Sequence, residues 1–193
     1  MKIEKFKIPY VDREISFDIP HGFVFLKGDN GAGKTMFLDA LSGLSVRNCS
    51  SIIERPKNIY INQNAFFSDK LKTIYLLKFV YCLDGSIWNE KKFWLFLENN
   101  LENEEIASIM NIMKKKWGIL SGGERRFVYL LIMLSLSREC YIIDEPFVFL
   151  DNTKKQVIIK IIKNRLSENR DIILSSHEYI DEINKMKPYI VEL

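Results

Sequence analysis

Cysteine is scarce in this chain of 193 residues, which contains only Cys49, Cys82 and Cys140. Their number is odd and no two form a C-x-x-C pair, which indicates free thiols in a reducing compartment. No apolar run reaches the roughly 18 residues that a membrane-spanning helix needs, and the charged N-terminus does not fit a signal peptide. We therefore expect a cytoplasmic location.

An excess of charge of one sign is also lacking. The 28 basic and 25 acidic residues leave a formal net charge of +3, and the one basic triplet, Lys114–Lys116, is typical of a solvated helix end. The composition therefore gives no reason to expect a nucleic-acid partner. Hydrophobic residues make up 47% of the chain and aromatic residues 12%, which predicts a packed globular domain rather than disorder.

The most informative stretch is 28–35, GDNGAGKT, which fits the pattern G-x-x-x-x-G-K-[ST] of a phosphate-binding loop. The apolar run before it predicts a strand and the residues after it predict a helix, and this context supports the motif. Glycines let backbone N–H groups turn toward an anion, and the helix N-terminus adds a partial positive charge. We expect a nucleotide to contact Asn30, Gly31, Ala32, Gly33, Lys34, Thr35 and Met36, with Lys34 at the β- and γ-phosphates and Thr35 at Mg²⁺.

Short apolar runs alternate with amphipathic stretches along the rest of the chain. Strands are expected at 2–8, 15–19, 58–61, 141–143, 171–175 and 189–191, and residues 66–118 are expected to be all-helical. This alternation predicts an α/β domain with a mostly parallel sheet. His21 lies in a predicted turn, without an expected partner, and is given no role.

The strand expected at 141–143 ends in Asp144 and Glu145. Open α/β sheets bind ligands at the carboxyl ends of their strands, which is where these two carboxylates would lie. Hydrolysis of a bound nucleotide needs a carboxylate that organises Mg²⁺ and a group that positions water. Asp144 is therefore the candidate Mg²⁺ ligand, and Glu145 is the candidate general base toward the attacking water.

In order and spacing, these motifs resemble the nucleotide-binding domain of ATP-binding cassette (ABC) proteins over nearly the whole chain. After the phosphate loop come Gln63, the pentad Leu120–Glu124 (LSGGE), the Asp144–Glu145 pair, Asp151 and His177. The Leu-Ser-Gly-Gly run is specific to this family among phosphate-loop ATPases. The resemblance implies an α/β fold with a P-loop NTPase core, a mostly parallel sheet, a small antiparallel β part and a helical subdomain, and an enzyme that hydrolyses ATP with Mg²⁺.

The resemblance also implies roles for single residues. Gln63 resembles the loop glutamine that contacts Mg²⁺ and water, and His177 resembles the switch histidine at the γ-phosphate. The expected catalytic residues are Lys34, Gln63, Glu145 and His177, and the expected metal ligands are Thr35, Gln63 and Asp144. Further nucleotide contacts are expected from Ser121, Gly122 and Gly123, which resemble the signature that closes on ATP held by a second cassette. Asp151 resembles the aspartate that links the two sites and is also expected to contact the nucleotide. The aromatic residue that stacks on adenine is expected to be Phe6, with Tyr10 as the alternative.

The sequence departs from the family pattern at two places near these residues. Met36 stands where the family often has a second hydroxyl at the α-phosphate, and 147–149 (FVF) replaces the small polar residues usual before Leu150 and Asp151. The stretch between Lys34 and Gln63 is short, so the antiparallel part is expected to be trimmed.

By resemblance we expect the ATPase subunit of a membrane transporter, an exporter rather than an importer, at the inner face of the cell membrane. Its expected partners are a transmembrane permease and a second cassette, identical or different. Residues 1–193 are expected to form one domain, with a core at about 1–63 and 124–193 and a helical subdomain at about 66–122. Two interpretations of the aromatic residues in this subdomain stay open: they dock the permease, or they form the core. These residues are Phe66, Phe67, Tyr75, Phe79, Trp88, Phe93 and Trp94.

Two alternatives remain open at this point. The first is a soluble ABC ATPase of the ribosome or chromosome type, although no coiled-coil heptads separate Gln63 from the signature and the chain holds a single cassette. The second is a nucleotide-binding regulator without turnover. The presence of all four expected catalytic-site residues argues against it; these are Lys34, Asp144, Glu145 and His177.

Overall fold

A computed structural model of the chain describes residues 2–8, 13–29, 31–44, 52–53, 56–63, 66–85, 90–177 and 181–193. The chain forms two compact units. The first comprises Met1–Gln63, Arg138–Phe147 and Ile162–Leu193, and the second comprises Asn64–Ser137 and Val148–Ile161. Strands and helices alternate along the chain, so the α/β class predicted from the sequence is confirmed.

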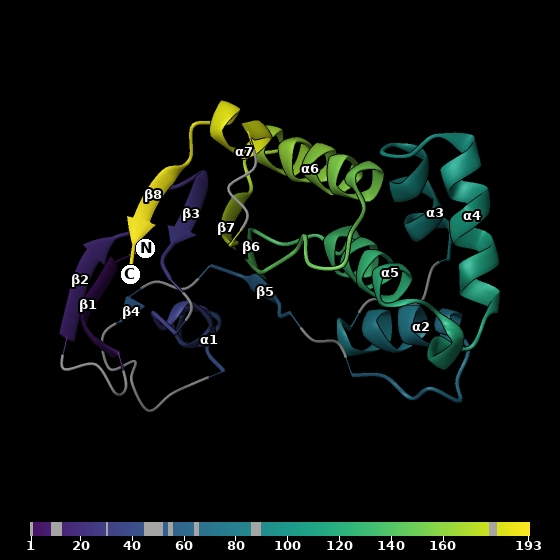
Figure 1. Ribbon diagram of the computed structural model, residues 1–193, viewed down its shortest axis with the longest axis horizontal. Helices are drawn as coiled ribbons and strands as arrows, with labels where there is room; N and C mark the ends of the chain where they lie inside the picture. The colour runs from purple at the N-terminus through teal and green to yellow at the C-terminus, as the bar shows by residue number, and fades with distance from the viewer. Residues whose placement is uncertain are drawn as a thin grey trace. The chain divides into compact units, whose positions relative to one another are not determined.

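A five-stranded sheet forms the centre of the first unit (Figure 1). Its strand order is β5-β6-β7-β3-β8, and every pairing within it is parallel. The strands are β3 (Phe23–Lys27), β5 (Asn58–Ile61), β6 (Cys140–Asp144), β7 (Asp171–Ser175) and β8 (Tyr189–Glu192). In the ladder Ser175 lies opposite both Leu26 of β3 and Asp144 of β6, so the three strands end at one edge.

The apolar character of these strands explains why they are interior. All five residues of β6 are buried, as expected for a parallel strand that is covered on both faces. Helix α1 (Lys34–Ser42) follows the phosphate loop and ends at Gly43. Its side chains share one core cluster with side chains of β3, β6, β7 and β8, a set that includes Phe37, Leu38, Leu41, Val24, Leu26, Ile142, Ile173 and Val191.

A small antiparallel sheet, which the family resemblance implied, also belongs to the first unit. It has the order β2-β1-β4, built from β1 (Lys2–Ile8), β2 (Arg13–Asp18) and the two-residue β4 (Ile52–Ile53). Both pairings are antiparallel. The short helix α7 (Asp181–Lys185) precedes β8.

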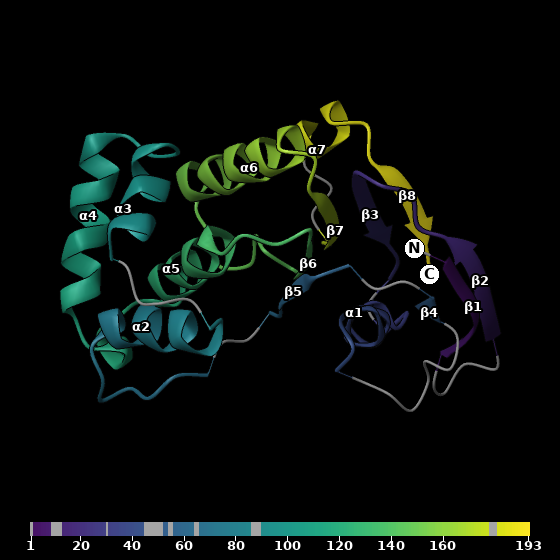
Figure 2. The same cartoon turned by 180° about the vertical axis from the view of Figure 1, so that it is seen from behind.

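Helices make up the second unit (Figure 2). They are α2 (Thr73–Leu83), α3 (Glu90–Glu98), α4 (Asn103–Lys114), a 3₁₀ turn at Trp117–Ile119 and α5 (Gly122–Ser135). Helix α6 (Asn152–Ser167) begins in this unit and ends in the first. The side chains of Leu77, Phe93, Leu97, Ile109 and Trp117 are buried here, so Phe93 is a core residue. No helix in the described part of the chain is both long and apolar enough to cross a membrane.

The turn before β3 differs from the expectation for His21. Its Nδ1 atom lies 2.9 Å from Oδ2 of Asp171, and the N–H of Gly22 donates to the other carboxylate oxygen of Asp171 at 2.7 Å. The prediction that His21 lacks a partner was therefore wrong. The two residues are 150 positions apart, and only the pairing of β3 with β7 brings them together.

The burial of Cys140 gives a first prediction. Cys140 in β6 is fully buried, and burial raises the pKa of its thiol to about 12. Because the thiolate is the reactive form, Cys140 should resist a thiol reagent at about pH 8, whereas the exposed Cys82 should react. We expect a Cys49→Ser variant to show one fast thiol when native and two when unfolded in denaturant. Two fast thiols in the native protein would contradict the placement of Cys140.

Candidate functional site

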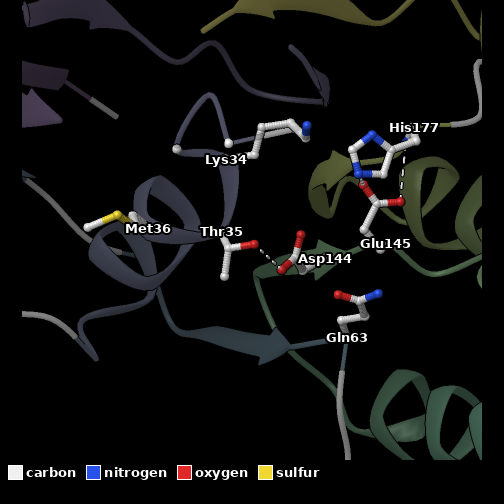
Figure 3. Close-up of a pocket in the computed structure, with 9 residues that line it drawn as sticks. Lys34, Thr35, Met36, Gln63, Asp144, Glu145 and His177 are labelled. Atoms are coloured by element: carbon white, nitrogen blue, oxygen red, sulfur yellow. Dashed lines mark hydrogen bonds and ion pairs between the residues drawn. The ribbon is translucent and has the colours of Figure 1, made fainter. Parts of the chain in front are cut away.

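A cavity of ≈ 280 Å³ lies in the first unit, at the edge where the parallel strands end. Nine residues line it, and they come from the phosphate loop, the start of α1, the stretch after β5, the end of β6 and the stretch after β7 (Figure 3). They are Gly31, Gly33, Lys34, Thr35, Met36, Gln63, Asp144, Glu145 and His177. The structure thus brings together the phosphate-loop, carboxylate, glutamine and histidine candidates that the sequence singled out.

The glycines of the phosphate loop are required by its backbone. Gly31 has φ 85° and Gly33 has φ 94°, which is the left-handed region that a Cβ disfavours. A Cβ on Gly28 would lie 3.1 Å from the carbonyl oxygen of Leu193 and 3.2 Å from Cβ of Ala32. The N–H of Ala32 donates to the carbonyl of Asp29 at 3.2 Å, which closes the turn.

The ammonium group of Lys34 lies over this loop. Its Nζ donates to the carbonyl oxygens of Gly28 at 2.7 Å and Asp29 at 3.0 Å, and the residue is buried. A cation held by neutral carbonyls at the N-terminus of a helix favours an anion as a further partner. A phosphate group on the loop would therefore find this charge already in place.

Asp144 forms the centre of the polar network on the sheet side of the cavity. It is 1% exposed, and its Oδ2 accepts a hydrogen bond from Oγ1 of Thr35 at 2.8 Å. Its Oδ1 accepts from Oγ of Ser175 at 2.5 Å. A threonine hydroxyl beside a carboxylate is an oxygen donor set that suits Mg²⁺.

The described residues contain no group of three or more His, Cys, Asp and Glu side chains that could hold a metal ion. Mg²⁺ is commonly bound by one or two carboxylates together with substrate phosphates and water. The donors of Thr35 and Asp144 fit that kind of site.

Glu145 is held in a strained backbone conformation directly after β6. It has φ 47°, which is uncommon for a residue other than glycine, and its N–H donates to the carbonyl of Ser175 at 3.0 Å. Its carboxylate accepts from the backbone N–H of His177 at 3.1 Å and lies 3.2 Å from Nε2 of the same histidine. Figure 3 shows the carboxylate and the imidazole next to one another, with the carboxylate pointing toward the ring.

Two further lining residues and two adenine candidates complete the comparison with the sequence. Gln63 follows β5 and lies near Asp144 and Glu145, whereas the Met36 side chain points away from both carboxylates (Figure 3). Phe6 is in β1, opposite Ile15 of β2. The Phe6 side chain lies outside the described part of the structure, as do the residues Asn30 and Tyr10.

The remaining candidates belong to the second unit. Ser121 is the N-cap of α5, and its Oγ accepts from the N–H of Glu124 at 3.1 Å. In return the Glu124 carboxylate accepts from the N–H of Ser121 at 2.8 Å, and this bond lowers the pKa of Glu124. The capping box predicted from the sequence is confirmed. Ser121 and Gly122 are exposed, and the first N–H groups of a helix have no partner within it.

Gly123 fits closely against the segment that leads to Asp151. A Cβ on Gly123 would lie 2.7 Å from the carbonyl oxygen of Phe149, a backbone atom that cannot easily move away. Phe149 has φ 66° and is 75% exposed. Asp151 accepts from the N–H of Lys154 at 2.9 Å, and its bonds to Lys154 lower the pKa of its carboxyl group. In this structure Asp151 therefore caps the start of α6.

Sequence analysis missed Ser175 as a site residue. Its hydroxyl donates to the carboxylate of Asp144 and its carbonyl accepts from the backbone N–H of Glu145, so it holds one carboxylate and the backbone of the other residue. The available signal was its place at the carboxyl end of an expected strand, because such ends meet at one edge of a parallel sheet.

The chain matches the ABC transporter family model over residues 13–148. The cytochrome c biogenesis ATP-binding export protein CcmA of Wolbachia pipientis wMel is 26% identical over 165 residues, covering 83% of this chain and 78% of that protein. The phosphonates import ATP-binding protein PhnC of Fusobacterium nucleatum is 27% identical over 186 residues, covering 86% and 75%. A solved dimeric, post-hydrolysis ATP-binding cassette bound to ADP and Pi has the same fold, with a TM-score of 0.75 and 17% identity, covering 100% of this chain and 93% of that chain.

The two glycines that flank α1 separate backbone strain from loss of binding. Gly33 at its start has φ 94° and Gly43 at its end has φ 91°, so alanine at either should cost about 1–2 kcal/mol of unfolding free energy. Of these two glycines, only Gly33 lines the cavity. We expect Gly33→Ala to weaken ATP binding in calorimetry and Gly43→Ala to leave it unchanged. Equal binding losses in the two variants would show that strain alone, and not the loop, is responsible.

Proposed function

The chain belongs to the ABC transporter family and is an ATP hydrolase of that family, and we propose that it powers export through a membrane permease by closing on ATP together with a second cassette. The observation that carries this proposal is the cavity in which Lys34, Thr35, Asp144, Glu145 and His177 meet. These are the groups that phosphoryl transfer to water requires: a cradle, a cation, a metal site and a base.

Binding begins at the phosphate loop in this account. The loop amides and the N-terminus of α1 favour the phosphate charge, and the Lys34 ammonium exchanges its carbonyl partners for the β- and γ-phosphates. Thr35 and Asp144 would hold Mg²⁺, with Gln63 beside them. A bound Mg²⁺ would neutralise charge on the phosphate oxygens.

Hydrolysis then depends on Glu145. Its carboxylate is nearly buried and already accepts a hydrogen bond from the backbone of His177. We propose that it takes a proton from the attacking water. The His177 side chain, 3.2 Å from the same carboxylate, would turn its imidazole to the γ-phosphate when the nucleotide is in place.

A second cassette, identical or different, would supply the other half of the site. The tip of α5, consisting of Ser121, Gly122 and Gly123, presents the Ser121 hydroxyl and the first amides of a helix, which is a favourable place for a phosphate. Asp151 would then connect the two sites of the pair. A dimeric cassette among the solved structures of this fold supports the arrangement.

The partner on the membrane side is inferred from α2. Thr73, Leu76, Leu77 and Tyr81 cover its buried face, yet its outer face exposes Tyr75 by 47%, Phe79 by 54% and Leu83 by 72%. These three, here called the α2 stripe, are spaced by four residues and so lie on one side of the helix. A helix that is apolar on both faces favours a partner on the outer one. We propose that the stripe docks a permease, which would hold the chain at the inner face of the membrane.

We also propose that transport is in the export direction. The organisation as a single domain with a helical part at about 66–122 is likewise a proposal. An export protein and an import protein are among the relatives, at 26% and 27% identity. The export direction is supported by the aromatic stretch after Gln63.

A substitution at the proposed base tests the chemistry. Glu145→Gln keeps the shape of the side chain but cannot accept a proton, so steady-state ATP hydrolysis should fall on the order of 10²-fold or more. ATP binding, measured by calorimetry, should be retained. Glu168→Gln, which alters an exposed carboxylate at the end of α6, is the matched control and should hydrolyse like the parent. A Glu145→Gln variant with parental turnover would show that Glu145 is not the base.

The α2 stripe gives a test of docking. Replacing Tyr75, Phe79 and Leu83 by Gln should leave ATP binding by the isolated chain unchanged, because these side chains are exposed. Co-sedimentation with inverted membrane vesicles of the host should be lost. The control replaces Leu95 and Met110, which are 57% and 45% exposed, and should sediment like the parent. Unaltered sedimentation of the stripe variant would remove the stripe as the docking surface.

A further inference from the structure

Arg125 of α5 folds back over the start of its own helix. Its Nε–H donates to the carbonyl oxygen of Leu120 at 3.1 Å, and one terminal nitrogen donates to the carbonyl of Gly118 at 2.8 Å. The guanidinium carbon lies 6.0 Å from the centre of the Trp117 ring. All three contacts are made to the short segment that precedes Ser121.

The segment that precedes Ser121 is also hydrogen-bonded to the residues before α2. The N–H of Trp117 donates to the carbonyl of Leu71 at 2.8 Å and that of Gly118 to the carbonyl of Asp69 at 3.1 Å. A Cβ on Gly118 would lie 2.7 Å from Cβ of Asp69. The Asp69 carboxylate also lies 3.6 Å from Arg125, but it is 70% exposed, so this ion pair adds little. The carbonyl bonds of Arg125 are therefore its main contribution.

One peptide group is held from both ends by this arrangement. The peptide between Leu120 and Ser121 is planar. Arg125 binds its carbonyl oxygen at 3.1 Å, and the Glu124 carboxylate accepts its N–H at 2.8 Å. With both ends fixed, the peptide cannot rotate, and its orientation sets the direction of the Ser121 side chain and of the first amides of α5.

We propose that Arg125 is a positioning residue for the second phosphate site. By holding the Leu120 and Gly118 carbonyls, it fixes the direction in which the hydroxyl of Ser121 and the amides of Gly122 and Gly123 face a phosphate held by a second copy. This inference rests on the proposed closure of two cassettes on ATP. Arg125 itself touches no nucleotide.

The chemistry of arginine explains why this residue type is needed. The guanidinium is a rigid planar fork that can serve two carbonyls at once, whereas a lysine ammonium acts as a single point donor. Arg125 is about one-third exposed, so water can take over the two carbonyls when the fork is removed. Removal should therefore cost little stability and mainly loosen the orientation of the helix tip.

The test measures assembly of the full chain. The dissociation constant of the dimer would be determined by analytical ultracentrifugation with Mg²⁺ and a non-hydrolysable ATP analogue, next to calorimetric binding of the same analogue to the monomer. The variants are Arg125→Met, Arg125→Lys, Gly122→Asp and Arg165→Met. Arg165 at the end of α6 pairs with Glu168 at 2.8 Å in the other unit, and it is the matched control for loss of a partly buried arginine.

We expect Arg125→Met to weaken dimerisation about tenfold or more, Arg125→Lys to lie between it and the parent, and both to bind the analogue normally as monomers. Arg165→Met should dimerise like the parent, and Gly122→Asp, which places a negative charge at the tip, should not dimerise. If Arg125→Met dimerises like the parent while Gly122→Asp does not dimerise, the proposed role of Arg125 is overturned but the closure of two cassettes is not.

Other outcomes also decide the question. Equal loss in Arg125→Met and Arg165→Met, or loss of monomer binding in Arg125→Met, would mark a merely structural role and overturn the inference. Parental dimerisation of Gly122→Asp would overturn the closure of two cassettes itself, and the inference with it. If Arg125→Met does not fold, the comparison of Arg125→Lys with the parent decides, and parental dimerisation of that variant then counts against Arg125.

Discussion

A single buried carboxylate, that of Asp144, holds the candidate site together. At 1% exposure this group would be costly to bury without partners. It receives hydrogen bonds from Thr35 at the start of α1 and from Ser175 at the end of β7. These two bonds join the phosphate loop to the sheet, and the parallel register that places Ser175 opposite both Leu26 and Asp144 makes them possible. The positions of Lys34, Glu145 and His177 depend on that junction.

The groups that would act on ATP already have partners within the chain. Lys34 is bonded to its own loop, and the Glu145 carboxylate is bonded to His177. When a nucleotide binds, the Lys34 and Glu145 side chains therefore exchange partners within the chain for the nucleotide and water. Because these side chains are already oriented before binding, the free-energy cost of organising the site is low. The proposed second anion site, at the tip of α5, is of a different kind, because it offers a hydroxyl and backbone amides at a helix end. Such a tip binds weakly alone, which fits its proposed role of closing on a phosphate that another copy already holds.

Those parts of the fold and the site whose sequence patterns span only a few neighbouring residues could be predicted. The strand, loop and helix around Gly28–Thr35, the capping box of Ser121 and Glu124, and the strand ending at Asp144 follow from residue types a few positions apart. The contacts that could not be predicted join distant residues. His21 and Asp171 are 150 positions apart, and Ser175 reaches Asp144 only through strand pairing. Arg125 is close in sequence to its carbonyl partners, yet its role depends on a 3₁₀ turn that no periodicity indicated.

The most direct test of this account is a crystal structure of the Glu145→Gln variant with ATP and Mg²⁺. The account predicts a pair of chains with each γ-phosphate between Lys34 of one copy and Ser121 of the other, and with Mg²⁺ at Thr35 and Asp144. It would be contradicted by ATP bound to a chain whose α5 tip faces only solvent, or by a Lys34 ammonium that remains on the carbonyls of Gly28 and Asp29 while the phosphates lie elsewhere.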